Sequence, residues 1–194
     1  METTLKKFID NQKLPFAAKD IKNLGVHPQY LTIALHKGIV EKIGHGIYIN
    51  PQSANDELFQ LQLQRNFIYS HATALYLWGM TDRDPLTLEA TVKRGYNSKS
   101  LNKAGFIIYT VKQAWFEFGK TQRETVFGNK VNVYDRERTL CDLLRSAGRQ
   151  DNYLIKEAFN SYTKSSNRNF SKLLHYAEVF RVQDKIKTYL EVLV

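Results

Sequence analysis

The chain has 194 residues, and its 28 lysines and arginines exceed its 19 acidic residues, for a formal net charge of +9. Hydrophobic residues make up 43% of it and aromatic residues 12%, which excludes disorder of the whole chain and favours one large or two small globular domains. The single cysteine, Cys141, excludes a disulfide framework and a cysteine-based zinc site.

The longest apolar run, residues 106–111, is far shorter than the roughly 20 residues that a membrane span needs. The first seven residues contain no apolar stretch after their charges, so they predict no secretory signal. We therefore expect a cytoplasmic protein with no membrane partner. The excess of basic over acidic residues favours a polyanionic partner, and nucleic acid is the first candidate. The alternative is an ordinary basic surface that is only solvated.

The first 50 residues predict three short helices followed by two strands. Helical periodicity, with glycine stops and Pro28 at a helix start, predicts helices over 4–11, 17–24 and 28–37. In the second of these helices, Ala18 and Ile21 are expected to face inward. The β-branched segments 39–43 and 47–50 predict strands, and the intervening Gly44-His45-Gly46 predicts a hairpin loop.

A polar, proline-containing stretch at 50–56 marks the clearest boundary, so we expect two domains, residues 1–52 and 53–194. The second is expected to be a mixed α/β domain with its strands first and its helices last, which makes the protein α+β. The predicted helices are 67–78, 136–147 (with Asp135 as N-cap), 153–164, 171–180 and 183–193. The predicted strands are 86–92 and 105–111, joined by a turn at 95–98, and a hairpin of 124–127 with 130–134.

The order of the first elements is that of a winged helix-turn-helix, in which one helix enters the DNA major groove and a β-ribbon forms the wing. The predicted recognition helix would expose side chains that can contact bases: Gln29, Tyr30, Thr32, Ile33, His36 and Lys37. The expected phosphate contacts are Lys19, Lys22, Lys37 and Lys42, with His45 at the tip of the wing. A winged helix that docks a protein instead of DNA remains an alternative.

A second set of charged residues lies in the later part of the chain. Lys93, Arg94, Lys99 and Lys103 cluster around one predicted loop and could form a second nucleic-acid surface or only a solvated one. Arg138 and Asp142 are spaced for an i,i+4 ion pair. Together with Glu137, they could instead face a partner protein and take part in antitoxicity.

Enzyme motifs are not recognisable. The five histidines form no HxH or HExxH pair, and the chain has no P-loop, GxGxxG or GxSxG sequence. Asp84, Glu89 and Lys93 weakly resemble a nuclease cluster, but Glu89 and Lys93 are four residues apart instead of two. We therefore expect no catalytic residues, no metal and no cofactor, with a nuclease as the least favoured alternative.

Four stretches of the sequence resemble the AbiEi-type antitoxins of AbiE abortive-infection systems. They are IVEKIGHGIY (39–48), SHATALYLWGMTDR (70–83), TVKRGYN (91–97) and YDRERTLCDLL (134–144), within a resemblance that spans about 5–164. His45 stands where an arginine is common between the two glycines of the family's wing.

The resemblance implies a phage-defence antitoxin of the type IV class with two roles. The winged helix would act as a transcriptional repressor of its own operon by binding inverted repeats in the promoter, with two copies on the DNA. The C-terminal domain would neutralise a toxin of the nucleotidyltransferase type, without a stable complex between the two proteins. An interaction module that sequesters its partner directly is the alternative.

Overall fold

The computed structural model describes residues 2–12, 14–53, 56–63 and 65–193. The chain forms two compact units. The first comprises residues 1–65 together with 125–129, and the second comprises 66–124 and 130–194. The boundary expected between residues 52 and 53 therefore falls inside the first unit.

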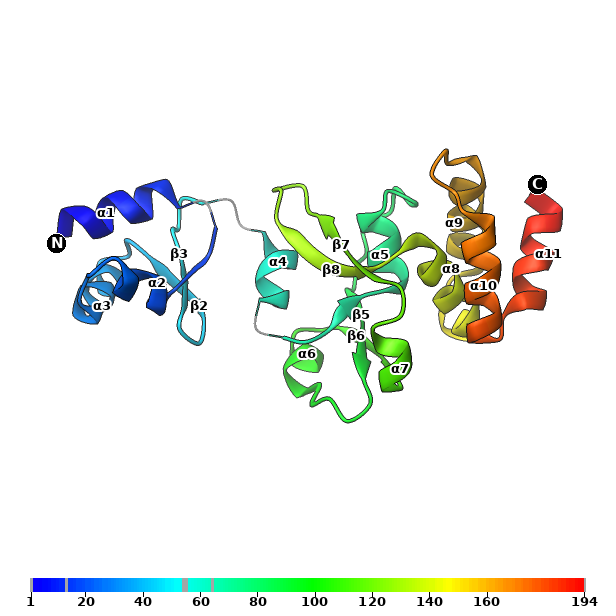
Figure 1. Cartoon of the computed structure of the whole chain (residues 1–194), viewed down its shortest axis with the longest axis horizontal. Helices are drawn as coiled ribbons and strands as arrows, with labels where there is room; N and C mark the ends of the chain where they lie inside the picture. The colour runs from blue at the N-terminus through cyan, green and yellow to red at the C-terminus, as the bar shows by residue number, and fades with distance from the viewer. Residues whose placement is uncertain (1, 13, 54–55, 64, 194) are drawn as a thin grey trace. The chain divides into compact units, whose positions relative to one another are not determined.

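Residues 2–49 of the first unit contain the helices α1 to α3 and a small sheet with strand order β1-β3-β2 (Figure 1). The helices are α1 (Glu2–Asn11), α2 (Ala18–Asn23) and α3 (Pro28–His36). The strands are β1 (Phe16–Ala17), β2 (Glu41–Gly44) and β3 (Ile47–Ile49), all antiparallel to their neighbours. The core between them consists of Leu5, Ile9, Phe16, Ile21, Val26, Leu31, Ala34 and Val40.

Local sequence explains where these helices begin and end. Gly25 and Gly38, with φ of 72° and 66°, follow α2 and α3 in the left-handed conformation that glycine adopts at least cost. The carboxylate of Asp20 accepts the Ala17 N–H at 2.8 Å at the start of α2. Two expectations need correction: Ala18 is exposed because it lies in the first turn on the outer face, and β1 was not predicted because it is only two residues long.

A further helix, α4 (Glu57–Gln62), also belongs to the first unit, and the sequence did not predict it. Asp56 caps it by accepting the Phe59 N–H at 3.2 Å. The other carboxylate oxygen of Asp56 accepts the Thr125 hydroxyl and, at 2.7 Å, the Asn129 side-chain amide. The buried Asp56 thus joins the start of α4 to the loop 125–129.

The second unit is built on a sheet of strand order β6-β5-β4-β8-β7. Its strands are β4 (Ile68–Tyr69), β5 (Glu89–Lys93), β6 (Ile107–Val111), β7 (Lys120–Glu124) and β8 (Lys130–Tyr134). The pairs β5–β6 and β4–β8 are parallel, whereas β4–β5 and β7–β8 are antiparallel.

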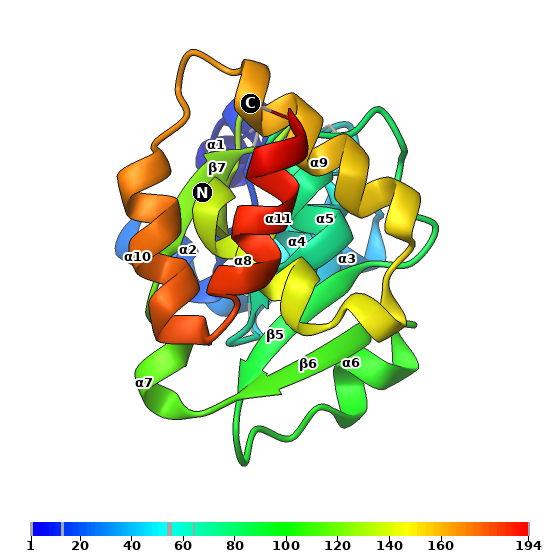
Figure 2. The same cartoon turned by 90° about the vertical axis from the view of Figure 1, so that its right-hand side faces the viewer.

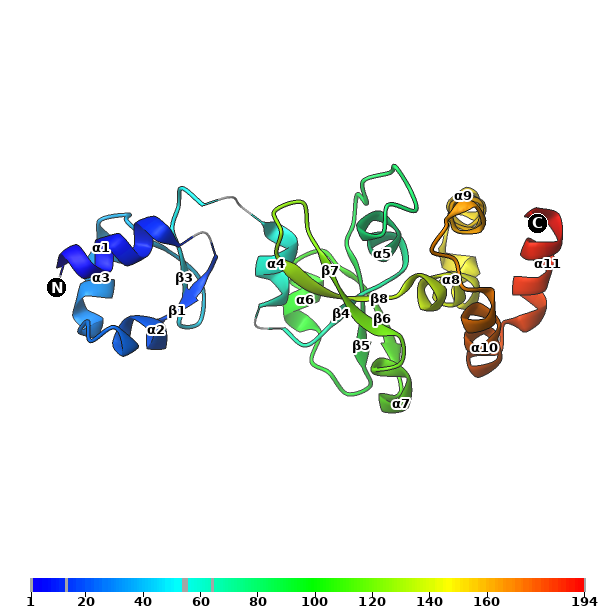
Figure 3. The same ribbon diagram turned by 45° about the horizontal axis from the view of Figure 1, so that its top comes forward.

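Seven α-helices are described in this unit: α5 (His71–Leu77), α6 (Lys99–Lys103), α7 (Gln113–Phe116), α8 (Arg136–Arg145), α9 (Asn152–Lys164), α10 (Phe170–Phe180) and α11 (Gln183–Leu193). A 3₁₀ turn, η1 (Ala147–Arg149), follows α8. Helices α8 to α11 gather on one side of the sheet (Figures 2 and 3). Their shared core includes Leu140, Cys141, Phe159, Leu173 and Ile186, each with no exposed surface.

The strands-then-helices order and the capped helix α8 confirm the α+β expectation, but the middle of the chain needs correction. Residues 67–70 lie outside any helix, since Ile68 and Tyr69 pair with strands on both sides. Strands β5 and β6 are not joined by a simple turn: they are parallel, so α6 forms the crossover between them. Helix α7 was also not predicted. Within the described ranges, no helix is long and apolar enough to cross a membrane.

Candidate nucleic-acid interface

Helix α3 presents one buried and one exposed face. Leu31 and Ala34 are buried in the core of the first unit. The exposed side chains are Gln29, Thr32, Ile33, His36 and Lys37. Tyr30, expected among them, is half-buried and packs against the core, because its position on the helix lies toward α1. The face available to a partner is therefore polar, with one isoleucine and one lysine at its edge.

The start of α3 and the wing are both held by hydrogen bonds. His27 caps α3, since its Nδ1 accepts the Gln29 N–H at 3.2 Å, and Pro28 occupies the first helical position. The wing is tied to α2, because Ala18 N–H donates to the Gly46 carbonyl at 3.0 Å. Lys19, Lys22, Lys42 and His45 are all exposed on these elements. The first 50 residues hold seven lysines against four acidic residues, so this segment carries a modest positive charge.

An apolar groove of about 460 Å³ lies between α1 and α3. Leu5 and Ile9 line it from α1, and Ile33 and Lys37 line it from α3. The edge of the exposed face that includes Ile33 and Lys37 therefore also borders an apolar surface. Such a surface can receive a hydrophobic side chain.

The residues predicted for a second basic surface differ in their exposure. Arg94, Lys99 and Lys103 are exposed along the segment between β5 and β6, and Lys93 is half-buried at the end of β5. Arg138 and Asp142, expected with them, are buried, with 0% and 2% of their surface exposed. Glu137 is buried as well. These three side chains are therefore buried within the second unit.

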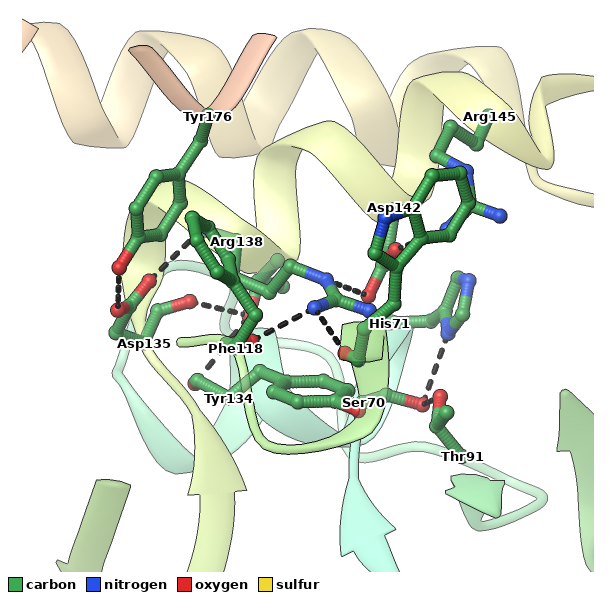
Figure 4. Close-up of polar contacts among 12 residues, drawn as sticks. Ser70, His71, Thr91, Phe118, Tyr134, Asp135, Arg138, Asp142, Arg145 and Tyr176 are labelled. Atoms are coloured by element: carbon green, nitrogen blue, oxygen red, sulfur yellow. Dashed lines mark hydrogen bonds and ion pairs between the residues drawn. The ribbon is translucent and has the colours of Figure 1, made fainter. Parts of the chain in front are cut away.

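Arg138 is instead the centre of an internal network (Figure 4). Its Nε donates to Asp142 at 2.8 Å, and its Nη1 donates to the carbonyls of Trp115 and Phe118 at 2.7 Å each. The rings of Tyr134 and Phe180 lie 4.2 and 4.1 Å from the guanidinium carbon. The ion pair predicted from the i,i+4 spacing is confirmed, but it is a buried structural pair.

Asp135 forms the other part of the network in Figure 4. It caps α8 as predicted, because its carboxylate accepts the Arg138 N–H at 2.8 Å. Its second oxygen accepts the Tyr176 hydroxyl at 3.1 Å and pairs with Lys172 at 3.0 Å. Asp135 therefore joins the start of α8 to α10.

His71, which the sequence did not single out, has the most unusual environment of the second unit. It is a non-glycine residue with a positive φ of 51°, it is 3% exposed, and its ring stacks on Tyr109 at 3.5 Å between centroids. Its Nδ1 lies 2.9 Å from the Ser70 hydroxyl, which accepts a hydrogen bond from Thr91 at 2.9 Å (Figure 4). Backbone strain of this kind costs on the order of 1–3 kcal/mol and is often found at functional sites. A single sequence gives no signal for a histidine in this conformation.

Burial sets the protonation of this region. Loss of solvation lowers the pKa of His71 to about 4, so its ring is neutral near pH 7. Burial also raises the pKa of Glu89, whose carboxylate accepts the Ala72 N–H at 3.0 Å and the Gln150 side-chain amide at 3.2 Å. The weakly predicted nuclease cluster is not assembled, since Glu89 is buried in these hydrogen bonds whereas Asp84 is exposed.

Helices α1 to α3 and the antiparallel β2–β3 ribbon have the order expected of a winged helix-turn-helix. Residues 4–51 match the family described as transcriptional regulator, AbiEi antitoxin. The N-terminal part of the chain is therefore similar to the AbiEi antitoxin regulators.

Structural comparison extends the similarity in fold over most of the chain. The crystal structure of the RV2827C protein from Mycobacterium tuberculosis is similar, with a TM-score of 0.61 at 10% sequence identity. The alignment covers 89% of this chain and 70% of that one, so the two share an architecture. No curated protein matches the sequence.

Proposed function

We propose that this protein is the antitoxin of a toxin–antitoxin pair that acts in abortive phage infection, and that it represses its own operon from the cytoplasm. The observation that carries the proposal is the exposed polar face of α3 within a domain that matches the AbiEi regulators over residues 4–51. In this role, α3 lies in the major groove of promoter DNA and the β2–β3 wing lies along the adjacent backbone.

The proposed DNA contacts are of two kinds, contacts to base edges and contacts to phosphates. Gln29 can pair with the edge of adenine, and Thr32 and Ile33 can contact a thymine methyl group, so these residues provide sequence preference. Lys19, Lys22 and Lys42 contact phosphates and provide affinity that depends on salt. Inverted repeats in the promoter require two copies of the protein, each with its α3 in one half-site.

A gel-shift titration with the protein's own promoter tests the repressor role. We expect a preference for that DNA over random duplex of the same length, lost when either inverted repeat is scrambled. Thr32→Ala and Lys37→Ala should weaken binding, whereas Lys164→Ala, an exposed lysine of the second unit, should not. Equal affinity for promoter and random DNA would contradict the repressor role.

We assign neutralisation of a nucleotidyltransferase-type toxin to the second unit. Co-expression with the product of the adjacent toxin gene tests this assignment through cell growth. Thr32→Ala should still rescue growth, because α3 has no part in neutralisation. If this variant is folded and fails to rescue growth at matched protein levels, the division of labour between the two units is wrong.

A second candidate function is a protein-docking winged helix that sequesters its partner directly. The apolar groove between α1 and α3 favours it, since Ile33 and Ile39 line the groove and are 37% and 39% exposed. Ile39→Glu distinguishes the two functions. It should abolish co-purification with a partner if the groove is a docking site, and it should leave promoter binding within about threefold of the original affinity if α3 acts on DNA.

A further inference from the structure

The second unit contains a cavity of about 420 Å³ beside His71. Strand β6 lines it with Tyr109 and Thr110, the end of α8 with Asp142 and Arg145, and η1 with Arg149. This volume is within the range of about 300–1,000 Å³ that is typical of small-molecule sites. No part of the proposed DNA interface contributes to it.

Positive charge dominates the surroundings of the cavity. Three guanidinium groups, those of Arg138, Arg145 and Arg149, and one carboxylate, that of Asp142, act electrostatically on His71. Arg138 and Arg145 share Asp142, at 2.8 and 2.9 Å. Among the described residues Arg149 forms no ion pair, and its guanidinium carbon lies 5.0 Å from the centre of the Tyr109 ring.

Glu89 is the other acidic group near Arg149, and it is already engaged. Its carboxylate accepts hydrogen bonds from Ala72 N–H and from Gln150, which also donates to the Tyr109 hydroxyl at 2.7 Å. Even with Glu89 ionised, the three arginines outnumber the two acidic groups. A bound anion would therefore balance charge that the chain leaves uncompensated.

His71 adds a neutral donor. With Thr91 as the donor to the Ser70 hydroxyl, the Ser70 proton is free for His71 Nδ1, and we assign the ring proton to Nε2 on this basis. Figure 4 shows this second ring nitrogen on the side away from Ser70. The described residues give Nε2 no hydrogen-bond partner. A buried, strained histidine is thus held with a free N–H at the cavity.

We propose that this cavity binds the phosphate group of a small phosphomonoester. Arg145 and Arg149 provide the charged hydrogen bonds that suit a phosphate, since a guanidinium can bind two of its oxygens at once. His71 Nε2–H adds a further donor. Tyr109 and Ile108 line the remainder of the cavity and leave room for the group that carries the phosphate.

Isothermal titration of the full chain tests the proposal with adenosine 5′-monophosphate, adenosine and inorganic phosphate as probes. We expect the monophosphate to bind at least about tenfold more tightly than adenosine. Arg149→Gln should weaken that binding by about tenfold or more, whereas Arg168→Gln, an exposed arginine of the same unit, should not change it. Inorganic phosphate that binds as tightly as the monophosphate would support an oxyanion site but overturn the assignment to a phosphomonoester.

Two results would overturn the site as a whole. One is that neither phosphate probe binds below about 10 mM. The other is that Arg149→Gln, with an unchanged circular dichroism spectrum, binds the monophosphate as well as the original protein does. Promoter binding is measured separately, so failure of this site leaves the repressor role untouched.

Discussion

Arg138 and Asp142 lie one turn apart on α8 and form an ion pair of 2.8 Å in the interior, with 0% and 3% of their side chains exposed. The same guanidinium binds the carbonyls of Trp115 and Phe118, in the segment around α7 that precedes β7. One arginine thereby links a helix of the bundle to the connection between two strands. The stability of the second unit should depend on it.

Arg138→Met should lower the free energy of unfolding by about 3–5 kcal/mol, because it leaves Asp142 buried with only Arg145 and leaves two carbonyls without their donor. Urea unfolding followed by circular dichroism measures the change. Lys120→Ala is the control, since it breaks an exposed i,i+3 pair with Glu117 and should cost less than about 1 kcal/mol. Equal losses in the two variants would show that the buried pair is not a major contributor.

Gly119→Ala should destabilise the protein more than Gly128→Ala. Both glycines have positive φ, 77° and 82°, so both substitutions incur a similar backbone strain of about 1–2 kcal/mol. A Cβ at Gly119 would lie 2.8 Å from the Cβ of Arg138, whereas a Cβ at Gly128 would meet nothing within 4 Å. We expect an additional loss of about 1–3 kcal/mol at Gly119, measured by the same urea titration. The prediction fails if the two variants unfold at the same urea concentration.

Stability should fall as the pH drops from about 6.5 to about 4, in part because of His71. The pKa of His71 is lowered to about 4 in the folded protein, while the unfolded chain keeps the ordinary value of 6.5. The unfolded state therefore binds the proton first, and acid favours it by up to about 3 kcal/mol across this window. His71→Asn tolerates the positive φ and removes the titrating group.

The measurement for His71 is the free energy of unfolding of the original protein and of His71→Asn at several pH values. The difference between the two should change between pH 6.5 and 4 and stay constant between pH 7 and 8. Carboxylates that titrate in both proteins cancel in this comparison. A difference that is flat over the whole range would show that His71 takes up its proton equally in the folded and unfolded states.

Lys22→Ala and Gln29→Ala should affect DNA binding in different ways. Loss of a phosphate contact should weaken binding to every duplex about equally and reduce the slope of log affinity against log salt by about 1. Loss of Gln29 should cost about 1–3 kcal/mol on the promoter and little on random DNA. Fluorescence anisotropy at several salt concentrations separates these effects. If both variants reduce the salt slope alike, the assignment of base and phosphate contacts is wrong.

The sequence predicted the helices α1 to α3 and the wing because their signals are local. Gly25, Pro28 and Gly38 mark the ends of helices through backbone geometry, and the 3.6-residue period of α3 separates Leu31 and Ala34 from the exposed face. Tyr30 was misplaced because a tyrosine at the edge of a helix can pack along the core as easily as face the solvent.

The second unit depends on contacts that a single sequence does not reveal. The apolar stretch at 67–78 has a helical length, but Ile68 and Tyr69 become a strand because partners distant in the chain flank them on both sides. Arg138 and Asp142 were predicted as a pair from their spacing, yet their burial follows from α10 and α7, which are far away in sequence. The environment of His71 likewise depends on Tyr109, which is distant in the sequence and lies against the His71 ring only in the folded sheet.

Cys141 has no exposed surface, and burial raises the pKa of its thiol far above the ordinary value. Only a thiolate reacts with alkylating reagents at a useful rate. Cys141 is therefore expected to stay unmodified as long as the helices around α8 remain packed together. The rate at which Cys141 is modified therefore reports how often this helix bundle opens, so transient opening can be measured without an added label.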